Sequence, residues 1–250
     1  ILRQSADSIR RVTLELGGKG ANVILDGADI DMAIDGSLFA CMANNGEACE
    51  AGTRLLIPSS RRDEIIGKLV ERAATLTLGD PLSPTTHVGP IISASQRDRI
   101  LDYFRIATEE GATIALGGHS PSGPEFEKGY WIEPTIFVDV TSDMRIAREE
   151  VFGPVLVVLT YDSVDEAIKI ANDTDYGLSA GVWGSEDRAL EVARRLDAGM
   201  VWVNNWHVIH PAYPFGGFKE SGLGREGGPH SIDEYVEQKF IPLDRSGGIE

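Results

Sequence analysis

The 250-residue chain alternates between short apolar runs and longer segments in which apolar residues recur every three or four positions. The runs predict buried strands, and the periodic segments predict amphipathic helices. Residues 29–44 illustrate the second kind, because Ile30, Ile34, Leu38 and Met42 fall on one helical face. Repeated alternation of strands and helices is typical of βαβ units. The pattern therefore predicts an α/β fold, with a largely parallel sheet and helices on both of its faces.

The same pattern places the individual elements along the chain. Strands are expected at residues 12–16, 23–26, 53–58, 154–160, 178–183 and 200–204. Helices are expected at residues 29–44, 93–111, 163–172, 185–197 and, more briefly, 232–238. Ser60 is expected to cap one further helix, with Asp63 three residues later. An extended tail is expected at residues 239–244.

Two long segments lack this periodicity. Residues 79–92 are rich in proline and glycine and are too long for a simple connection between elements. Residues 205–231 are aromatic and glycine-rich, and they directly follow a predicted strand. Long loops at the strand ends of an α/β fold are the usual place for a binding site. We therefore expect residues 205–231 to contribute to the functional site.

Composition and charge narrow the range of partners. The chain has 23 Lys and Arg against 39 Asp and Glu, a formal net charge of −16, which argues against nucleic acid or an anionic membrane as a partner. No apolar run approaches the roughly 20 residues that span a bilayer, and the first residues lack the apolar core of a secretory signal. The two cysteines do not suggest a disulfide framework. These features predict a soluble cytoplasmic protein.

The two cysteines lie in different settings. Cys41 is inside the helix expected at residues 29–44, where it is predicted to pack as an apolar residue. Cys49 follows the helix-ending residues 44–46, and its small neighbours leave backbone amides free to lower the pKa of the thiol and to stabilise an oxyanion. The adjacent acids Glu47 and Glu50 oppose thiolate formation. From these residues alone, Cys49 is either a nucleophile or a small buried hydrophobe.

Glu15 is a second candidate for chemistry. It lies between Leu14 and Leu16, and such apolar surroundings raise the pKa of a carboxyl and make it a useful base near neutral pH. The alternative is a solvated carboxylate at a strand end. The separation of Glu15 from Cys49 fits two loops that meet in the fold. Lys19 is not part of a complete phosphate-binding motif, so we expect it to be structural or solvated.

A third candidate site contains Glu150 and Phe152. A carboxylate can accept hydrogen bonds from both hydroxyls of a ribose, and an aromatic ring can lie against a nicotinamide. On an extended segment these two side chains would share one face, because they are two residues apart. The alternative is a charged loop, residues 145–150, followed by a phenylalanine of the core.

Four motifs together point to a known family. They are TLELGGK at residues 13–19, NNGEACEAGTR at 44–54, EEVFGPV at 149–155 and PFGGFKESG at 214–222. In this order they resemble the motifs of the aldehyde dehydrogenase superfamily, in which glutamine often stands in place of Glu47. Enzymes of this kind usually have about twice this length. The resemblance implies a C-terminal half without its N-terminal cofactor domain. Residues 1–17 would be a remnant of that domain, 18–217 the catalytic domain, and 218–250 a return segment and oligomerisation tail.

The resemblance also implies a reaction, the oxidation of an aldehyde to a carboxylic acid. Cys49 would add to the aldehyde as a thiohemiacetal, hydride would pass to NAD or NADP, and Glu15 would activate the water that hydrolyses the thioester. Glu150 and Phe152 would contact the cofactor. A chain without the cofactor domain is expected to be inactive as a dehydrogenase. The alternatives are a cofactor-independent thiol esterase and a non-catalytic oligomerisation fragment.

Further residues and partners follow from the same resemblance. Trp206, His207 and Ile209 would line the substrate channel. His207 and His210 raise the question of a metal, but no carboxylate or cysteine lies at ligand spacing, so no metal site is predicted. The C-terminal tail implies a homodimer or a dimer of dimers.

Overall fold

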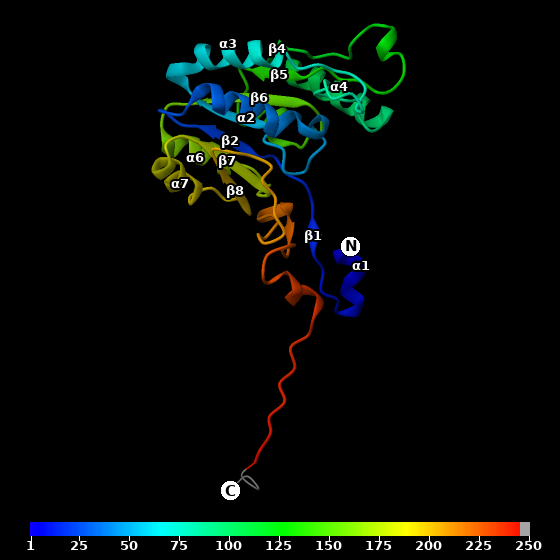
Figure 1. Ribbon diagram of the computed structural model, residues 1–250, viewed down its shortest axis with the longest axis vertical. Coiled ribbons are helices and arrows are strands. Elements are labelled where there is room, and N and C mark those ends of the chain that lie inside the picture. The colour runs from blue at the N-terminus through cyan, green and yellow to red at the C-terminus, as the bar shows by residue number, and fades with distance from the viewer. Residues whose placement is uncertain (246–250) are drawn as a thin grey trace.

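The computed structural model describes residues 1–245, and within them a seven-stranded sheet forms the centre of the molecule (Figure 1). Its strand order is β4-β5-β6-β3-β2-β7-β8, and every neighbouring pair except β4 with β5 is parallel. The strands are β2 (Ala21–Ile24), β3 (Arg54–Pro58), β4 (Thr113–Leu116), β5 (Thr135–Val138), β6 (Val155–Tyr161), β7 (Ser179–Trp183) and β8 (Met200–Val203). The prediction of a largely parallel α/β sheet is confirmed.

Helices cover both faces of this sheet. They are α2 (Ile30–Met42), α3 (Arg62–Ala73), α4 (Ala94–Glu109), α5 (Arg145–Arg148), α6 (Val164–Asn172) and α7 (Glu186–Ala193). Alternate residues of β6 point to opposite faces, as the pleat of a strand requires. Leu156 belongs to a core cluster with residues of α2 and α3, whereas Val157 belongs to a second cluster with residues of α4, α5, α6 and α7. The apolar stripe predicted for residues 29–44 is buried in the first cluster.

Some expected details differ from the structure. β4 and β5 were not expected, because β4 is half exposed and each strand has only four residues. Ser60 does not cap α3. A 3-10 helix (Ser59–Arg61) precedes α3, and its Ser59 hydroxyl donates to the carbonyl of Tyr161 instead. Ser93 and Ser163 do cap α4 and α6, each by accepting from the backbone N–H three residues later.

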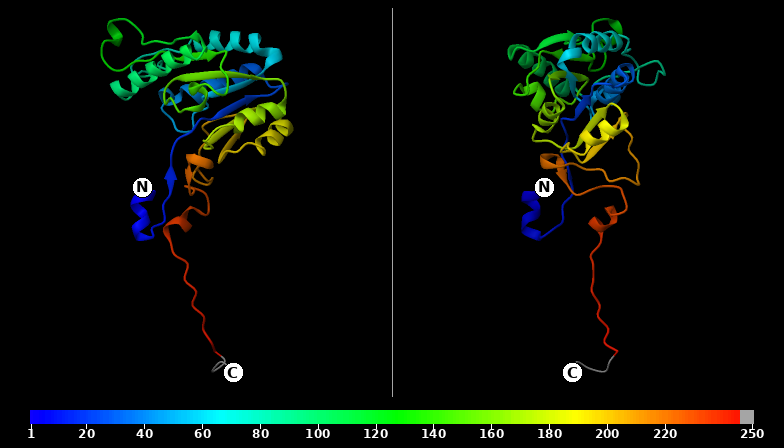
Figure 2. Two further views of the ribbon diagram at one scale, coloured as in Figure 1. Left: turned by 180° about the vertical axis from the view of Figure 1, so that it is seen from behind. Right: turned by 90° about the vertical axis from the view of Figure 1, so that its left-hand side faces the viewer.

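A segment near each end of the chain pairs outside the main sheet, while the C-terminal tail runs away from it (Figure 1). β1 (Leu14–Glu15), which follows α1 (Leu2–Ser5) and a 3-10 helix (Ala6–Ser8), pairs antiparallel with β9 (Gly222–Leu223). The helix expected at 232–238 is a 3-10 helix (Ser231–Tyr235), and Figure 2 shows residues 239–244 extending away from the body as expected. Residues 246–250 of the predicted tail lie outside the described residues. Within residues 1–245, no helix has the length and apolarity needed to cross a membrane.

Candidate active site

A left-handed turn carries the chain from α2 to Cys49. Asn44, Asn45 and Gly46 have φ of 51°, 62° and 68°, so α2 ends at Met42, two residues earlier than expected. Asparagine tolerates this conformation better than most residues, and glycine has no steric penalty there. The run Asn-Asn-Gly therefore determines where the helix stops and how the loop with Cys49 begins.

This turn joins three segments that are far apart in the sequence. Gly46 packs directly on the backbone of the next segment, where an added Cβ would lie 2.6 Å from the nitrogen of Pro154 and closer still to the carbonyl of Gly153. Asn45 accepts from the N–H of Gly89 at 2.6 Å and donates to the carbonyl of Pro90 at 3.1 Å. The loop with Cys49 is thus fixed between residues 149–155 and the loop at residues 79–92.

The thiol of Cys49 is half-buried and protonated in this setting. Sγ donates to Oε2 of Glu50 at 3.2 Å. Burial, and after it the Glu50 carboxylate, raise the pKa of Cys49 to about 12, and the amides of Cys49 and Glu50 only partly oppose this rise. The backbone amides thus lower this pKa as expected, but burial and the predicted opposition of Glu50 outweigh them. Cys41 is fully buried in the core, as predicted.

The two acids beside Cys49 have different roles. Glu50 is buried, and its Oε1 lies 3.0 Å from Nδ1 of His207; this hydrogen bond lowers the pKa of Glu50. Glu47 instead accepts from the N–H of Ile92 at 3.2 Å. Only Glu50, therefore, contacts the thiol. The pair of Glu50 with His207 could not be predicted from local sequence, because the two residues are 157 positions apart.

The three predicted channel residues lie in three different environments. His207 lies against the carboxylate of Glu50. Trp206 is 4% exposed, packs on Trp202 at a centroid distance of 5.0 Å, and donates from Nε1 to the carbonyl of Glu50 at 3.1 Å. Its indole therefore has little surface to offer a ligand. Ile209 is 53% exposed and lines a cavity of about 320 Å³ together with Trp202, Val208 and Tyr213. Of the three, within residues 1–245, only Ile209 borders that cavity.

Glu15 lies on β1 and faces the C-terminal segment. Glu15 is an exposed residue, as the alternative of a solvated carboxylate at a strand end expected. Limited desolvation still raises the pKa of its carboxyl, the negative charge of Glu226 adds to the rise, and Arg225 opposes it, so only the direction of the predicted pKa shift is confirmed. Among residues 1–245, Glu15 makes no hydrogen bond and no ion pair that joins it to Cys49. The link between the two motifs runs through backbone instead, because Gly18 lies against the carbonyl of Cys49, where an added Cβ would come within 2.7 Å.

Glu150 lies beside the same glycine turn. Its Oε1 accepts from the N–H of Gly18 at 3.0 Å, and the carboxylate packs against Gly17. Burial raises the pKa of Glu150, and the hydrogen bond from Gly18 partly offsets this. A carboxylate offers about four acceptor positions, so Glu150 can still accept from further hydroxyl groups. The cysteine motif, the glutamate motif and Glu150 therefore meet at one turn.

The segment that contains Phe152 is not extended. Phe152 has φ of 62°, so the backbone turns there, and the argument that Glu150 and Phe152 share a face by alternation is wrong. Gln96 of α4 holds this turn by donating from Nε2 to the carbonyls of Val151 and Phe152 at 2.9 and 2.7 Å. The role of Gln96 was not evident in the sequence, since it depends on where α4 packs.

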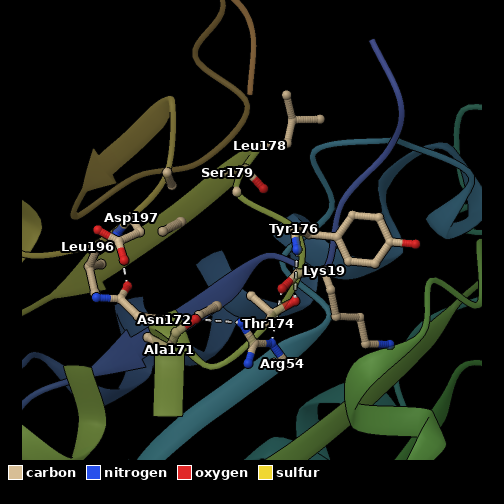
Figure 3. A pocket seen from close by; sticks show the side chains of 14 residues that line it. Lys19, Arg54, Ala171, Asn172, Thr174, Tyr176, Leu178, Ser179, Leu196 and Asp197 are labelled. Carbon is tan, nitrogen blue, oxygen red and sulfur yellow. Dashed lines mark hydrogen bonds between the residues drawn. The ribbon is translucent and has the colours of Figure 1, made fainter. Parts of the chain in front are cut away.

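Lys19 and Arg54 are both buried cations. Figure 3 shows them at a small cavity of about 10 Å³, which has room for one water. Arg54 is buried and donates to the carbonyls of Lys19, Ile170 and Ala171 at 3.0, 3.0 and 2.8 Å. Lys19 is also buried, and burial together with the charge of Arg54 lowers its pKa to about 7. Of the two readings left open for Lys19, its burial contradicts the solvated one.

Comparison with known proteins agrees with this arrangement. The model of the aldehyde dehydrogenase family matches residues 1–241. A betaine aldehyde dehydrogenase of Brucella anthropi is 43% identical over 98% of this chain and 50% of its own length. A putative aldehyde dehydrogenase, DhaS, of Bacillus subtilis is 44% identical over 96% of this chain and 48% of its own length. The chain therefore belongs to the aldehyde dehydrogenase family, and it spans about half the length of these curated relatives.

Solved structures give the same result. An aldehyde dehydrogenase from Bacillus cereus in complex with NAD+ superposes with a TM-score of 0.90 at 45% identity, over 94% of this chain and 48% of that one. A betaine aldehyde dehydrogenase from Staphylococcus aureus in complex with NAD+ has a TM-score of 0.94 at 37% identity, over 100% of this chain and 50% of that one. The fold is thus one found in NAD+-bound members of the family.

Proposed function

We propose that this chain is the C-terminal, catalytic half of an enzyme that oxidises an aldehyde to a carboxylic acid with NAD+ or NADP+. One observation carries the proposal: the Cys49 loop packs against the glycine turn after Glu15 and against the backbone of the segment that contains Glu150. Each of these segments matches a motif of the family. The contacts to the rest of the dinucleotide would come from an N-terminal half, as in the relatives of twice this length.

The residues of this chain divide the chemistry between them. Sγ of Cys49 adds to the aldehyde carbon, and the backbone amide of Cys49 stabilises the resulting oxyanion. When bound, NAD(P)+ accepts the hydride whose loss converts the thiohemiacetal to a thioester. Glu15, whose pKa is raised, then takes a proton from the water that hydrolyses the thioester. The loop after β8, with Ile209, would border the aldehyde.

The chain offers part of a cofactor site. Glu150 fits the ribose next to the nicotinamide, because its carboxylate is partly buried and, among residues 1–245, one of its oxygens is engaged, by the N–H of Gly18. Phe152, two residues further along the chain, is half-buried. These residues would hold and orient the nicotinamide end.

We expect the 250-residue chain alone to produce no NAD(P)H from aldehyde, because the adenosine and phosphate contacts are not provided by its own residues. The measurement is NAD(P)H absorbance with betaine aldehyde and with acetaldehyde, in the presence of NAD+ or NADP+. Cys49→Ala provides the background. The positive control is a chimera in which this chain replaces the C-terminal half of the Bacillus cereus enzyme. Robust NAD(P)H formation by the isolated chain would contradict the proposed division of the site.

We also propose that the C-terminal tail binds a neighbouring subunit as an added strand. Arg11 anchors the start of the tail through Glu237 at 2.7 Å, and beyond it Phe240, Ile241 and Leu243 are more than two-thirds exposed. An extended apolar segment of this kind is suited to strand addition. Deleting residues 238–250 is expected to lower the oligomeric state, measured by light scattering after size exclusion. An unchanged mass would argue against this role.

A further inference from the structure

A chain of hydrogen bonds links the candidate nucleophile to a buried carboxylate and then to an imidazole. Sγ of Cys49 donates to Oε2 of Glu50 at 3.2 Å, and Oε1 of Glu50 lies 3.0 Å from Nδ1 of His207. The side chains of His207 and Glu50 are only 12% and 11% exposed. An ionised carboxylate this far from water is costly unless hydrogen bonds hold it. Both of its oxygens are engaged here, one by the imidazole and the other by the thiol.

The backbone at His207 is bent to place the imidazole. Its φ is 57°, a left-handed conformation that is costly for most side chains and that persists only where the surroundings impose it. The ring packs edge-on against Phe39 of α2 at a centroid distance of 5.1 Å. Because an ionised carboxylate only accepts, Nδ1 has to carry the hydrogen of the bond to Glu50.

The second nitrogen of the ring supports the same assignment. Nε2 of His207 is buried and has no hydrogen-bond partner among residues 1–245. The contact of the ring with polar groups of the described chain is therefore made through Nδ1. His207 holds Glu50 in place by donating from that nitrogen.

Glu50 is also fixed by its backbone. Its carbonyl accepts from the hydroxyl of Ser179 on β7 at 2.9 Å and from Nε1 of Trp206 at 3.1 Å. Within residues 1–245, the ionisable groups that act on its carboxylate are Cys49 and His207. The uncharged groups of Ser179 and Trp206 contact its main-chain carbonyl, and Phe39 packs on the His207 ring. Both the main chain and the carboxylate of Glu50 are therefore held in place.

We infer that Glu50 is a catalytic residue that accepts the proton of Cys49 as the sulfur attacks, and that His207 is its positioning residue. The inference rests on the proposed function, in which Cys49 is the nucleophile. In the step, the Sγ–H bond breaks and its proton passes to Oε2 of Glu50. The sulfur electron pair forms the bond to the aldehyde carbon, and the C=O π pair becomes the oxyanion. One negative charge moves from the carboxylate to that oxygen.

Direct proton transfer to Glu50 would allow Cys49 to react although the pKa of its thiol is high. With a thiol pKa near 12, almost no thiolate is present at neutral pH, so a mechanism that waits for free thiolate would be slow. A carboxylate within hydrogen-bond reach lets the neutral thiol react, since the proton leaves as the new bond forms. The rate should then not depend on pH while Glu50 is ionised and Cys49 is protonated.

The test is the rate at which iodoacetamide alkylates Cys49, followed by peptide mass spectrometry, which separates it from Cys41. We expect the rate for the unaltered chain to be nearly flat between about pH 6 and 9. Glu50→Gln should be slower at neutral pH, by about 100-fold, and should rise about tenfold per pH unit. Glu47→Gln is the matched control, because its carboxylate faces Ile92 rather than the thiol, and it should keep the flat profile.

Two outcomes would overturn the inference. One is a profile of the unaltered chain that itself rises about tenfold per pH unit. The other is faster alkylation of Glu50→Gln at neutral pH, which would mean that Glu50 only suppresses ionisation of the thiol. The first of these measurements uses the unaltered chain, so its result can be interpreted even if Glu50→Gln folds poorly.

His207 is tested with a conservative pair. His207→Ala removes the donor to Glu50 and should shift the profile toward that of Glu50→Gln. His207→Asn can place an amide N–H where Nδ1 lies and tolerates the positive φ, so it should restore the flat profile. An unchanged profile for His207→Ala would exclude the positioning role. These measurements use neither aldehyde nor NAD(P)+. The inference about Glu50 can therefore be refuted while the proposed dehydrogenase activity stands, and the dehydrogenase activity can be refuted while the inference stands.

Discussion

Replacing Cys49 by alanine is expected to abolish the burst of p-nitrophenol that the chain releases from p-nitrophenyl acetate. Acyl transfer from an activated ester needs the same sulfur as aldehyde addition but no hydride acceptor, so the isolated chain can perform it. The unaltered chain should release close to one equivalent per chain in the burst. The loss in Cys49→Ala should be at least about 1,000-fold, as for other covalent nucleophiles.

The control for this measurement is the second cysteine. Cys41 is fully buried in α2, and burial raises its pKa to about 12, so it should not react with the ester. Cys41→Ala should therefore retain the burst, and intact-mass spectrometry should show the acetyl group only in chains that keep Cys49. A burst of equal size in Cys49→Ala would assign the acyl group to another side chain. It would leave both the dehydrogenase and the thiol esterase hypotheses without their nucleophile.

The sheet could be predicted from sequence where its strands are buried on both faces. Residues of β3 and β6 form nearly continuous apolar runs, which is the pattern of a central parallel strand. β4 lies at the edge, where it pairs antiparallel with β5 and is half exposed, so its short run did not stand out. β5 is buried next to it but has only four residues, and it too was missed. The end of α2 was misplaced for a local reason, namely the left-handed Asn44 and Asn45.

The candidate site was predictable only where one short motif carries the chemistry. Cys49, Glu15 and Glu150 each lie in such a motif, and the structure brings their backbones together at the glycine turn. The contact of Glu50 with His207 depends on a bent backbone at residue 207 and on the way the loop after β8 folds back. Neither feature has a signature in local sequence, since both arise from packing between distant segments.

Gly46→Ala is expected to lower the free energy of unfolding by about 3 kcal/mol and to disturb the site as well. Alanine at φ of 68° costs about 1–2 kcal/mol, and the new methyl group would overlap the backbone at Gly153 and Pro154, where overpacking costs about 1–3 kcal/mol. That backbone leads back to Glu150, so the Cys49 loop and the candidate cofactor segment should separate. Urea unfolding followed by circular dichroism measures the first effect, and the ester burst measures the second.

Gly67→Ala is the matched control for this substitution. Gly67 lies on the exposed face of α3, and an added Cβ there meets nothing within 4 Å. The same change of side chain should therefore raise stability by about 0.5–1 kcal/mol, because alanine favours the helix, and should leave the burst unchanged. If Gly46→Ala proved as stable and reactive as Gly67→Ala, the close packing of the Cys49 loop on residues 153–154 would be refuted. The backbone contact that joins the nucleophile to the cofactor segment would then have no role in shaping the site.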